Sequence, residues 1–263
     1  MDKVALDSFL TPRGTLIFTL TSNGYKFYTL NLVRHLQKIG VAWRLCIFCA
    51  DAASHKFFSQ EGIPCRRLPD LLPEFGAHTV PFGTRQFQQL NRKKLDILKG
   101  LVERADVQLG IYMDGDIVVY RDFLADVESR LDADPARILF QCDENESRFD
   151  CSGATCPTPC SGFIAWRHGG AATSDLFRVD EATREAWREC PEDQVFIQKM
   201  LKRGGAAYTT LPRELYPNGR FSGRGGVEAR AQKGVAFLLH YNYLIGDAKK
   251  QRMRNNGDWL LPY

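Results

Sequence analysis

The chain has 263 residues and a formal net charge of +4, and 44% of its residues are hydrophobic and 25% charged. This composition is typical of a globular protein and excludes disordered, collagen-like and low-complexity chains, while the near balance of charges gives no reason to expect a nucleic-acid partner. Because no run of about 18 apolar residues is present and the first residues lack the pattern of a signal peptide, we expect a soluble, cytoplasmic protein without a transmembrane segment.

The first third of the sequence alternates between strand and helix patterns. Residues 14–22 are rich in β-formers and precede a helical pattern that ends at Gly40. A continuous apolar run at residues 43–50 predicts a strand that is buried on both faces. The pattern continues with a short helix, a strand, a loop and a long helix, at residues 53–60, 63–68, 71–83 and 84–102. This alternation predicts an α/β fold with a mainly parallel sheet, whose ligands bind beyond the carboxyl ends of the strands.

The apolar run at residues 107–120 contains two aspartates, and we interpret it as one further strand. Asp114 and Asp116 are expensive to bury in apolar surroundings unless a partner compensates their charge. A divalent cation such as Mg²⁺ or Mn²⁺ is such a partner and commonly bridges carboxylates to substrate phosphates. Gly115 would let the backbone approach a ligand closely. The alternative is a strand that ends at Met113, followed by a solvated turn.

The second half of the sequence is less regular. A polar loop at residues 142–160 and a long Gly- and Arg-rich loop at residues 216–234 separate the other elements. The patterns predict strands at residues 138–141, 161–166 and 237–241 and helices at residues 173–187 and 192–203. Because there is no internal repeat and no linker-like break in composition, we predict a single domain over residues 1–263.

Four segments, in order along the chain, resemble one enzyme family. The segment IYMDGDIVVYRD resembles the DXD motif of GT-A glycosyltransferases. These enzymes use nucleotide sugars as donors. Two central segments and one closing segment resemble the nucleotide-diphospho-sugar transferase family that contains the retaining enzymes of the GT77 type: CSGFIAWRHGGAATSDLF, EDQVFIQKML and HYNYLIGDAKKQRMRNNGDW. Ser161 departs from the family, which often has Asn before Gly-Phe. The resemblance covers roughly residues 14–260 and implies a GT-A-type, Rossmann-like fold with a mixed, mainly parallel central sheet.

The resemblance implies a role for the charged residues near the motifs. Asp114 and Asp116 would bind the metal and the diphosphate, with His240 as a further metal ligand from the C-terminal segment; the alternative for His240 is a hydrogen-bonded histidine at a strand end. Cations that would contact the leaving diphosphate are Lys249, Lys250 and Lys94, with Arg92 and Lys93 as alternatives to Lys94. The alternative for Lys249 and Lys250 is a solvated helix start. The half formed by residues 1–120 would bind the nucleotide, and residues 121–263 would form the acceptor side.

Two further sets of polar residues complete the predicted site. The ends of the first two strands carry Thr19, Thr21, Ser22 and Asp51, which suit contacts to the base and ribose or, alternatively, act as ordinary helix caps. Asp193 and Gln194 begin a helix, where a carboxylate has favourable dipole energy. The resemblance places Asp193 near the transferred sugar, and we predict Asp193 and Gln194 as catalytic residues.

The cysteines point to no separate chemistry. Cys46 and Cys49 have the C-x-x-C spacing but lie in an apolar strand, so we expect buried, inactive thiols. The spacing of Cys142, Cys151, Cys156 and Cys160 is not that of a common zinc site, which favours loop thiols or a local disulfide over zinc.

Together the motifs predict a metal-dependent glycosyltransferase. It would move a sugar from a nucleotide diphosphate sugar, with UDP expected from the resemblance, to a hydroxyl of a glycan or other acceptor, with retention of configuration. One alternative is a nucleotidyltransferase of the same fold, although TLTSNGYKF lacks the Gly-rich signature expected after the first strand. The other is a non-catalytic domain that binds carbohydrate or nucleotide. The sequence does not indicate the oligomeric state.

Overall fold

The main sheet has seven strands in a computed structural model that describes residues 6–40, 45–68, 81, 83–134, 138–143, 158–169, 173–189, 191–204, 207–219 and 234–262. Its order is β3-β2-β1-β4-β7-β6-β8, and every strand pair within it is parallel except the two pairs that β7 makes with β4 and β6. The strand bounds are β1 (Thr15–Thr21), β2 (Leu45–Cys49), β3 (Cys65–Arg67), β4 (Leu109–Met113), β6 (Ile138–Cys142), β7 (Pro159–Arg167) and β8 (Tyr208–Thr210). The mixed, mainly parallel sheet predicted from the sequence is confirmed.

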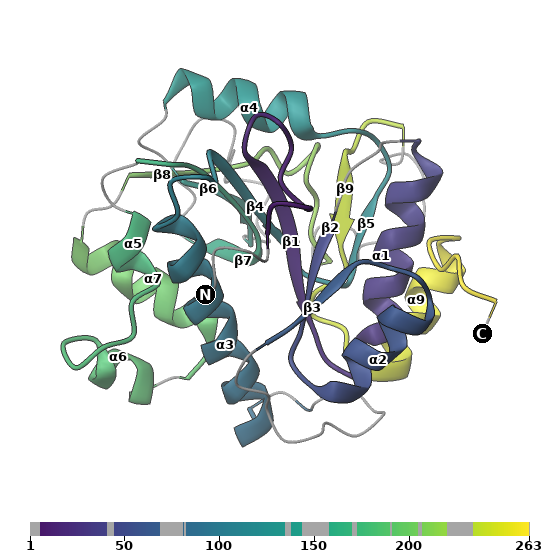
Figure 1. Ribbon diagram of the computed structural model, residues 1–263, viewed down its shortest axis with the longest axis horizontal. Helices are drawn as coiled ribbons and strands as arrows, with labels where there is room; N and C mark the ends of the chain where they lie inside the picture. The colour runs from purple at the N-terminus through teal and green to yellow at the C-terminus, as the bar shows by residue number, and fades with distance from the viewer. Residues whose placement is uncertain are drawn as a thin grey trace.

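Helices cover both faces of this sheet (Figure 1). Successive side chains of a strand point to opposite faces, so Leu16 and Phe18 of β1 belong to one core cluster and Ile17 to the other. The first face packs against α3 (Arg85–Val102), α5 (Thr173–Leu176), α6 (Arg184–Glu189) and α7 (Asp193–Gly204). The second face packs against α1 (Lys26–Lys38), α2 (Ala52–Gln60) and α4 (Leu124–Ala133).

A small second sheet pairs β5 (Ile117–Val119) with β9 (Leu238–His240) in antiparallel register. The prediction of one strand over residues 107–120 is therefore wrong, because β4 and β5 belong to different sheets. The chain leaves the main sheet after β4, and the amide of Ile117 donates to the carbonyl of Asp114 at 3.1 Å, which closes a turn. The strand ends at Met113, as the alternative had it, but the turn is only partly solvated, because the side chain of Asp114 is 31% exposed and Asp116 only 5%. Directly after β9 and a short loop comes α9 (Gly246–Asn255).

One predicted helix is interrupted. The pattern at residues 173–187 folds as α5 and α6, because Asp180 and Thr183 form a local turn between them: the amide of Asp180 donates to Thr183 Oγ1 at 2.9 Å, and the amide of Thr183 donates to Asp180 Oδ1 at 3.2 Å. Such side-chain bonds to the backbone compete with helix formation. The sequence patterns did not predict α4 or the short edge strand β8.

The remaining predicted elements lie where they were expected, with ends shifted by a few residues. Most of the predicted loops at residues 71–83, 142–160 and 216–234 lies outside the described residues. Within the described part of the chain, no helix combines the length and the apolar character needed to cross a membrane.

Candidate functional site

Most of the predicted site residues gather around one cavity of about 610 Å³ beyond the carboxyl ends of β1 and β4. Its lining includes ten of them: Thr21, Ser22, Lys94, Asp114, Gly115, Asp116, Asp193, Gln194, His240 and Lys249. Thr19, Asp51 and Lys250 are not among the described residues that line it. The cavity thus brings together segments from both ends of the chain, as the parallel sheet predicts.

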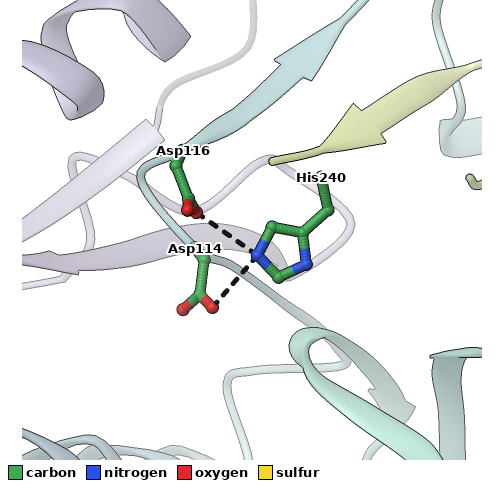
Figure 2. A group of neighbouring side chains, drawn as sticks. All are labelled: Asp114, Asp116 and His240. Carbon is green, nitrogen blue, oxygen red and sulfur yellow. Dashed lines mark ion pairs between the residues drawn. The ribbon is translucent and has the colours of Figure 1, made fainter. Parts of the chain in front are cut away.

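Two carboxylates and one imidazole converge at this cavity (Figure 2). His240 Nε2 lies 3.3 Å from Asp116 Oδ1 and 3.5 Å from Asp114 Oδ2. One ligand atom from each residue lies within 4.8 Å of the others, which makes this the group in the described part of the chain that could hold a metal ion. The predicted trio of Asp114, Asp116 and His240 is therefore brought together by the fold.

The closeness of these side chains depends on a glycine in β7. The pairing of β7 with β6 shifts its register next to Gln141, while the amide of Asp114 still bonds the carbonyl of Gly162 at 2.8 Å. A Cβ at Gly162 would collide with the His240 ring and lie 2.8 Å from Asp114 Oδ2. Gly115 has a different reason: a Cβ there would collide with Thr29 Oγ1 of α1. Register shifts such as the one between β6 and β7 are frequent next to active sites.

Asp116 is compensated by two cations. Lys249 Nζ of α9 donates to Asp116 Oδ2, and the side chains of both residues are 7% exposed. Burial alone would raise the pKa of Asp116, but Lys249 and His240 hold this pKa below its usual value. Burial would lower the pKa of Lys249, yet the Asp116 carboxylate raises it, so Lys249 stays charged.

His240 is buried, and its two ring nitrogens have different partners. Burial would lower the pKa of His240, but the Asp116 carboxylate raises this pKa well above the usual histidine value. On the far side of the ring, Nδ1 lies 3.0 Å from Gln141 Oε1 and 3.6 Å from Cys160 Sγ. Gln141 was not predicted as a site residue, because it sits in a predicted strand with no motif around it.

Lys94 links the two predicted carboxylate groups. Its ammonium lies 3.3 Å from Asp114 Oδ1 and 2.6 Å from Asp193 Oδ2, and Tyr112 OH donates to Asp114 Oδ1 at 2.5 Å. Burial would lower the pKa of Lys94, but Asp114 and Asp193 raise it. Burial would raise the pKa of Asp193, and Lys94 brings it below its usual value. Both groups are therefore charged in the absence of any ligand.

The three candidate cations on α3 are now separated. Arg92 bonds Asp96 at 3.2 Å and the carbonyl of Val179 at 2.7 Å, and neither Arg92 nor Lys93 is among the described residues that line the cavity. Lys94 is the one that faces it.

Gln194 is fixed by a carboxylate that the sequence patterns did not indicate. Gln194 Nε2 donates to Asp143 Oδ2 at 2.9 Å, and Gln194 Oε1 accepts from the amide of Ser161 at 3.3 Å. The other donors to Asp143 come from the segments before and after β9: Asn218, Asn242 and Tyr243. Asp143 directly follows the buried strand β6, and Asp51 likewise stands close to the end of a buried strand, β2.

The predicted nucleotide-contact residues differ in their surroundings. Ser22 Oγ is buried at the cavity and has no hydrogen-bond partner among the described residues. The same is true of Thr19 Oγ1, which does not line the cavity. Thr21 accepts from Thr29 Oγ1 at 2.9 Å. Asp51 is a helix cap, since its two oxygens accept from the amides of Asn23 at 2.8 Å and Ser54 at 2.7 Å. The alternative interpretation of Asp51 as a cap thus describes its observed contacts.

Lys250 is directed away from the cavity. Its ammonium lies 5.0 Å from the ring centroid of Trp259, a cation–π contact. Of the two adjacent lysines predicted to contact a diphosphate, the structure brings Lys249 to the site and leaves Lys250 outside it.

Four of the five cysteines in the described residues are buried, and Cys65 is half-buried. Among the described residues, Cys46, Cys49 and Cys160 are buried free thiols and Cys142 is buried, and burial raises the pKa of Cys46 to about 12. Cys151 and Cys156 lie outside the described residues.

The donor set fits a divalent cation. Carboxylate oxygens suit Mg²⁺ and Mn²⁺, and an imidazole nitrogen is accepted more readily by Mn²⁺ than by Mg²⁺. The two carboxylates and the imidazole nitrogen already face a common point in a cavity (Figure 2). The residues present therefore suit the metal that the sequence predicts.

Comparisons with known proteins agree with this geometry. A family model described as nucleotide-diphospho-sugar transferase matches residues 41–253. No curated protein sequence matches the chain. Among solved structures, the chain is similar to an active-site mutant of LgtC, with 13% identity, a TM-score of 0.58, and coverage of 93% of this chain and 96% of that one.

Two further structures extend the likeness. The galactosyltransferase LgtC in complex with donor and acceptor sugar analogs shares 13% identity over 93% of this chain and 96% of its own, with a TM-score of 0.57. Mouse xyloside xylosyltransferase 1 in its apo form shares 11% identity over 87% of this chain and 98% of its own, with a TM-score of 0.53. At such identities the likeness describes the fold.

Proposed function

Because this chain belongs to the nucleotide-diphospho-sugar transferase family and has its GT-A fold, we propose that it transfers a sugar from a nucleotide diphosphate sugar to an acceptor hydroxyl. UDP as the nucleotide, Mn²⁺ or Mg²⁺ as the metal, a glycan or other hydroxyl compound as the acceptor, and retention of configuration are parts of this proposal. The observation that carries it is the convergence of Asp114, Asp116 and His240 in a cavity that Lys249 also lines. Membership of the GT77-type branch, a single-domain organisation and a cytoplasmic location stay predictions of the sequence.

The first part of the mechanism concerns the diphosphate. Asp114, Asp116 and His240 Nε2 would hold the cation, which when bound neutralises the diphosphate and makes it a better leaving group. Lys249 is charged and already beside Asp116. Its ammonium can therefore donate to diphosphate oxygens as negative charge develops on them during bond cleavage. Because Lys249 is buried, this attraction is weakened little by solvent.

The second part concerns the transferred sugar. Lys94, Asp193 and Gln194 line the same cavity, and their mutual contacts fix the directions of their polar groups. The Asp193 carboxylate, kept ionised by Lys94, can accept hydrogen bonds from sugar hydroxyls or stabilise an oxocarbenium-like transition state. Gln194 offers an amide held between Ser161 and Asp143. These contacts support Asp193 and Gln194 as groups that act on the donor sugar.

The two alternatives predict different ligand responses. A nucleotidyltransferase would use a nucleoside triphosphate, and a non-catalytic domain would bind its ligand without turnover. The test is a screen of nucleotide sugars for metal-dependent release of nucleoside diphosphate, together with thermal unfolding in UDP and Mn²⁺. A ligand at 100 times its Kd stabilises the native state by about 2.7 kcal/mol. Stabilisation without release by any sugar nucleotide, with or without acceptors, would favour the binding domain.

A further inference from the structure

Gln141 lies directly behind the histidine of the candidate metal group. It is fully buried near the end of β6, next to the register shift between β6 and β7. Its Oε1 is 3.0 Å from His240 Nδ1, the ring nitrogen that faces away from Asp114 and Asp116 (Figure 2). Gln141 itself is not among the described residues that line the cavity.

The orientation of the Gln141 amide follows from its other partners. Gln141 Nε2 donates to the carbonyl of Tyr216 at 2.9 Å and to the carbonyl of Pro217 at 2.7 Å. A carbonyl oxygen can only accept a hydrogen bond, so the amino group must face these two oxygens. Oε1 is then the atom that faces His240, and it can only accept as well. The proton in this contact therefore belongs to His240 Nδ1.

A proton on Nδ1 decides what the other nitrogen can do. A neutral imidazole carries one proton, so a ring protonated at Nδ1 has its lone pair on Nε2. Nε2 is the atom directed at the two carboxylates, 3.3 and 3.5 Å away. The backbone of Gly162 packs so closely against one side of the His240 ring that a Cβ there would collide with it. Packing thus fixes the position of the His240 ring, and the hydrogen bond to the Gln141 amide oxygen fixes its tautomer.

We propose that Gln141 is the positioning residue of the metal site: it holds His240 in the Nδ1-protonated tautomer, so that Nε2 is available as a metal ligand. This inference rests on the proposed function in one respect, namely that the protein binds a divalent cation at this site. Partners of this kind behind a ligating histidine typically change metal affinity by about 10–100-fold when they are removed.

Two substitutions separate this role from a structural one. Gln141→Glu keeps an oxygen acceptor for Nδ1 but cannot donate to the carbonyls of Tyr216 and Pro217 unless it is protonated, and Gln141→Met loses both kinds of bond. The free Mn²⁺ signal in electron paramagnetic resonance gives the affinity for Mn²⁺ alone, without substrate. We expect Gln141→Met to lose about 10–100-fold in Mn²⁺ affinity and Gln141→Glu to stay within a few-fold of the wild type.

Cys160→Ala is the matched control, because Cys160 Sγ lies 3.6 Å from the same nitrogen. We expect it to keep wild-type affinity. Equal losses in Gln141→Glu and Gln141→Met would overturn the inference, since both lose the carbonyl bonds. A loss confined to Cys160→Ala would overturn it too. A wild-type protein that binds no Mn²⁺ would instead overturn the metal site itself, and the inference with it.

The tautomer can be observed without any Gln141 variant, in case these fail to fold. Nitrogen-15 spectra of histidine side chains in the wild-type protein with Mg²⁺ should show His240 protonated at Nδ1, and the signal is assigned by its loss in His240→Asn. A ring protonated at Nε2 and not at Nδ1 under these conditions would overturn the inference.

Discussion

Lys249 and Asp116 form a buried ion pair, with only 7% of each side chain exposed. The two residues lie 133 positions apart in the sequence, and their contact attaches α9 to the turn between the two sheets. A buried pair stabilises a protein little compared with apolar residues, but removal of one partner leaves an uncompensated charge. In this protein the pair therefore holds Asp116 of the candidate metal group in place, and loss of either partner should destabilise the fold around it.

The first prediction concerns that stability. Asp116→Ala should destabilise the metal-free protein by about 3–5 kcal/mol, because Lys249 and His240 are then left facing each other in the interior. Asp116→Ala combined with Lys249→Met should be less destabilised than the sum of the two single variants. Urea unfolding without metal measures all three free energies of unfolding. Additive losses would show that the two side chains do not interact.

The second prediction concerns the pH dependence of metal binding. The pKa of His240 is raised well above its usual value in the metal-free protein, and a ligating imidazole must be unprotonated. Mn²⁺ affinity should therefore fall as the pH decreases, and the fall should begin above the usual histidine pKa of about 6.5. Calorimetry between pH 6 and pH 9 measures it.

His240→Asn supplies the control for this titration, because an amide oxygen can bind the metal without a proton to lose. Its affinity should be weaker and less dependent on pH in the same range. If the wild type and His240→Asn showed the same pH slope, the titrating group would not be His240.

How much of the site the sequence predicts depends on the distance between partners along the chain. Asp114, Asp116, His240 and Lys249 stand in short motifs, so their residue types and spacing are informative by themselves. The hydrogen-bond partners of Gln141 lie 75 to 99 positions away along the chain, and no local sequence pattern predicts such contacts. The same holds for Asp143, whose donors come from three separate segments.

The fold shows the same division. Periodicity predicted every strand of the main sheet except β8 and most of the helices that cover it, because each of these elements buries a regular set of apolar positions. It failed at residues 107–120, where β4 and β5 are both apolar and nothing local shows that the chain changes sheets. It also could not distinguish Lys249 from Lys250, since only the direction of α9 decides which of them faces the cavity.

The third prediction uses the neighbouring lysines of α3. Lys94→Met should leave Asp114 and Asp193 without their shared cation, and we expect a loss of about 3–5 kcal/mol in the free energy of unfolding and a large loss of turnover. Lys93→Met is the matched control, because Lys93 is partly exposed and is not among the described residues that line the cavity. It should change stability by no more than about 0.5 kcal/mol. Equal effects of the two variants on turnover would remove Lys94 from the site.

The last prediction concerns Asn91, which stands one helical turn before Lys94 in the cavity wall. Its Nδ2 is buried and finds no acceptor in the described part of the chain. An unsatisfied buried donor costs about 1–3 kcal/mol, so a bound ligand that supplies an oxygen would recover this energy. Because Asn91 lines the same cavity as Lys94 and Asp193, we expect that oxygen to belong to the donor sugar.

Asn91→Leu should then have opposite effects on stability and binding. Without ligand, the free energy of unfolding should rise, because the unsatisfied amide is gone. The affinity for UDP should stay as in the wild type, while the affinity for the sugar nucleotide that the wild type uses best should fall by about tenfold, the equivalent of 1.4 kcal/mol. Urea unfolding and calorimetry measure the three quantities. Equal weakening of UDP and the sugar nucleotide would place the partner of Asn91 on the nucleotide, and unchanged affinity for both would show that Asn91 contacts neither.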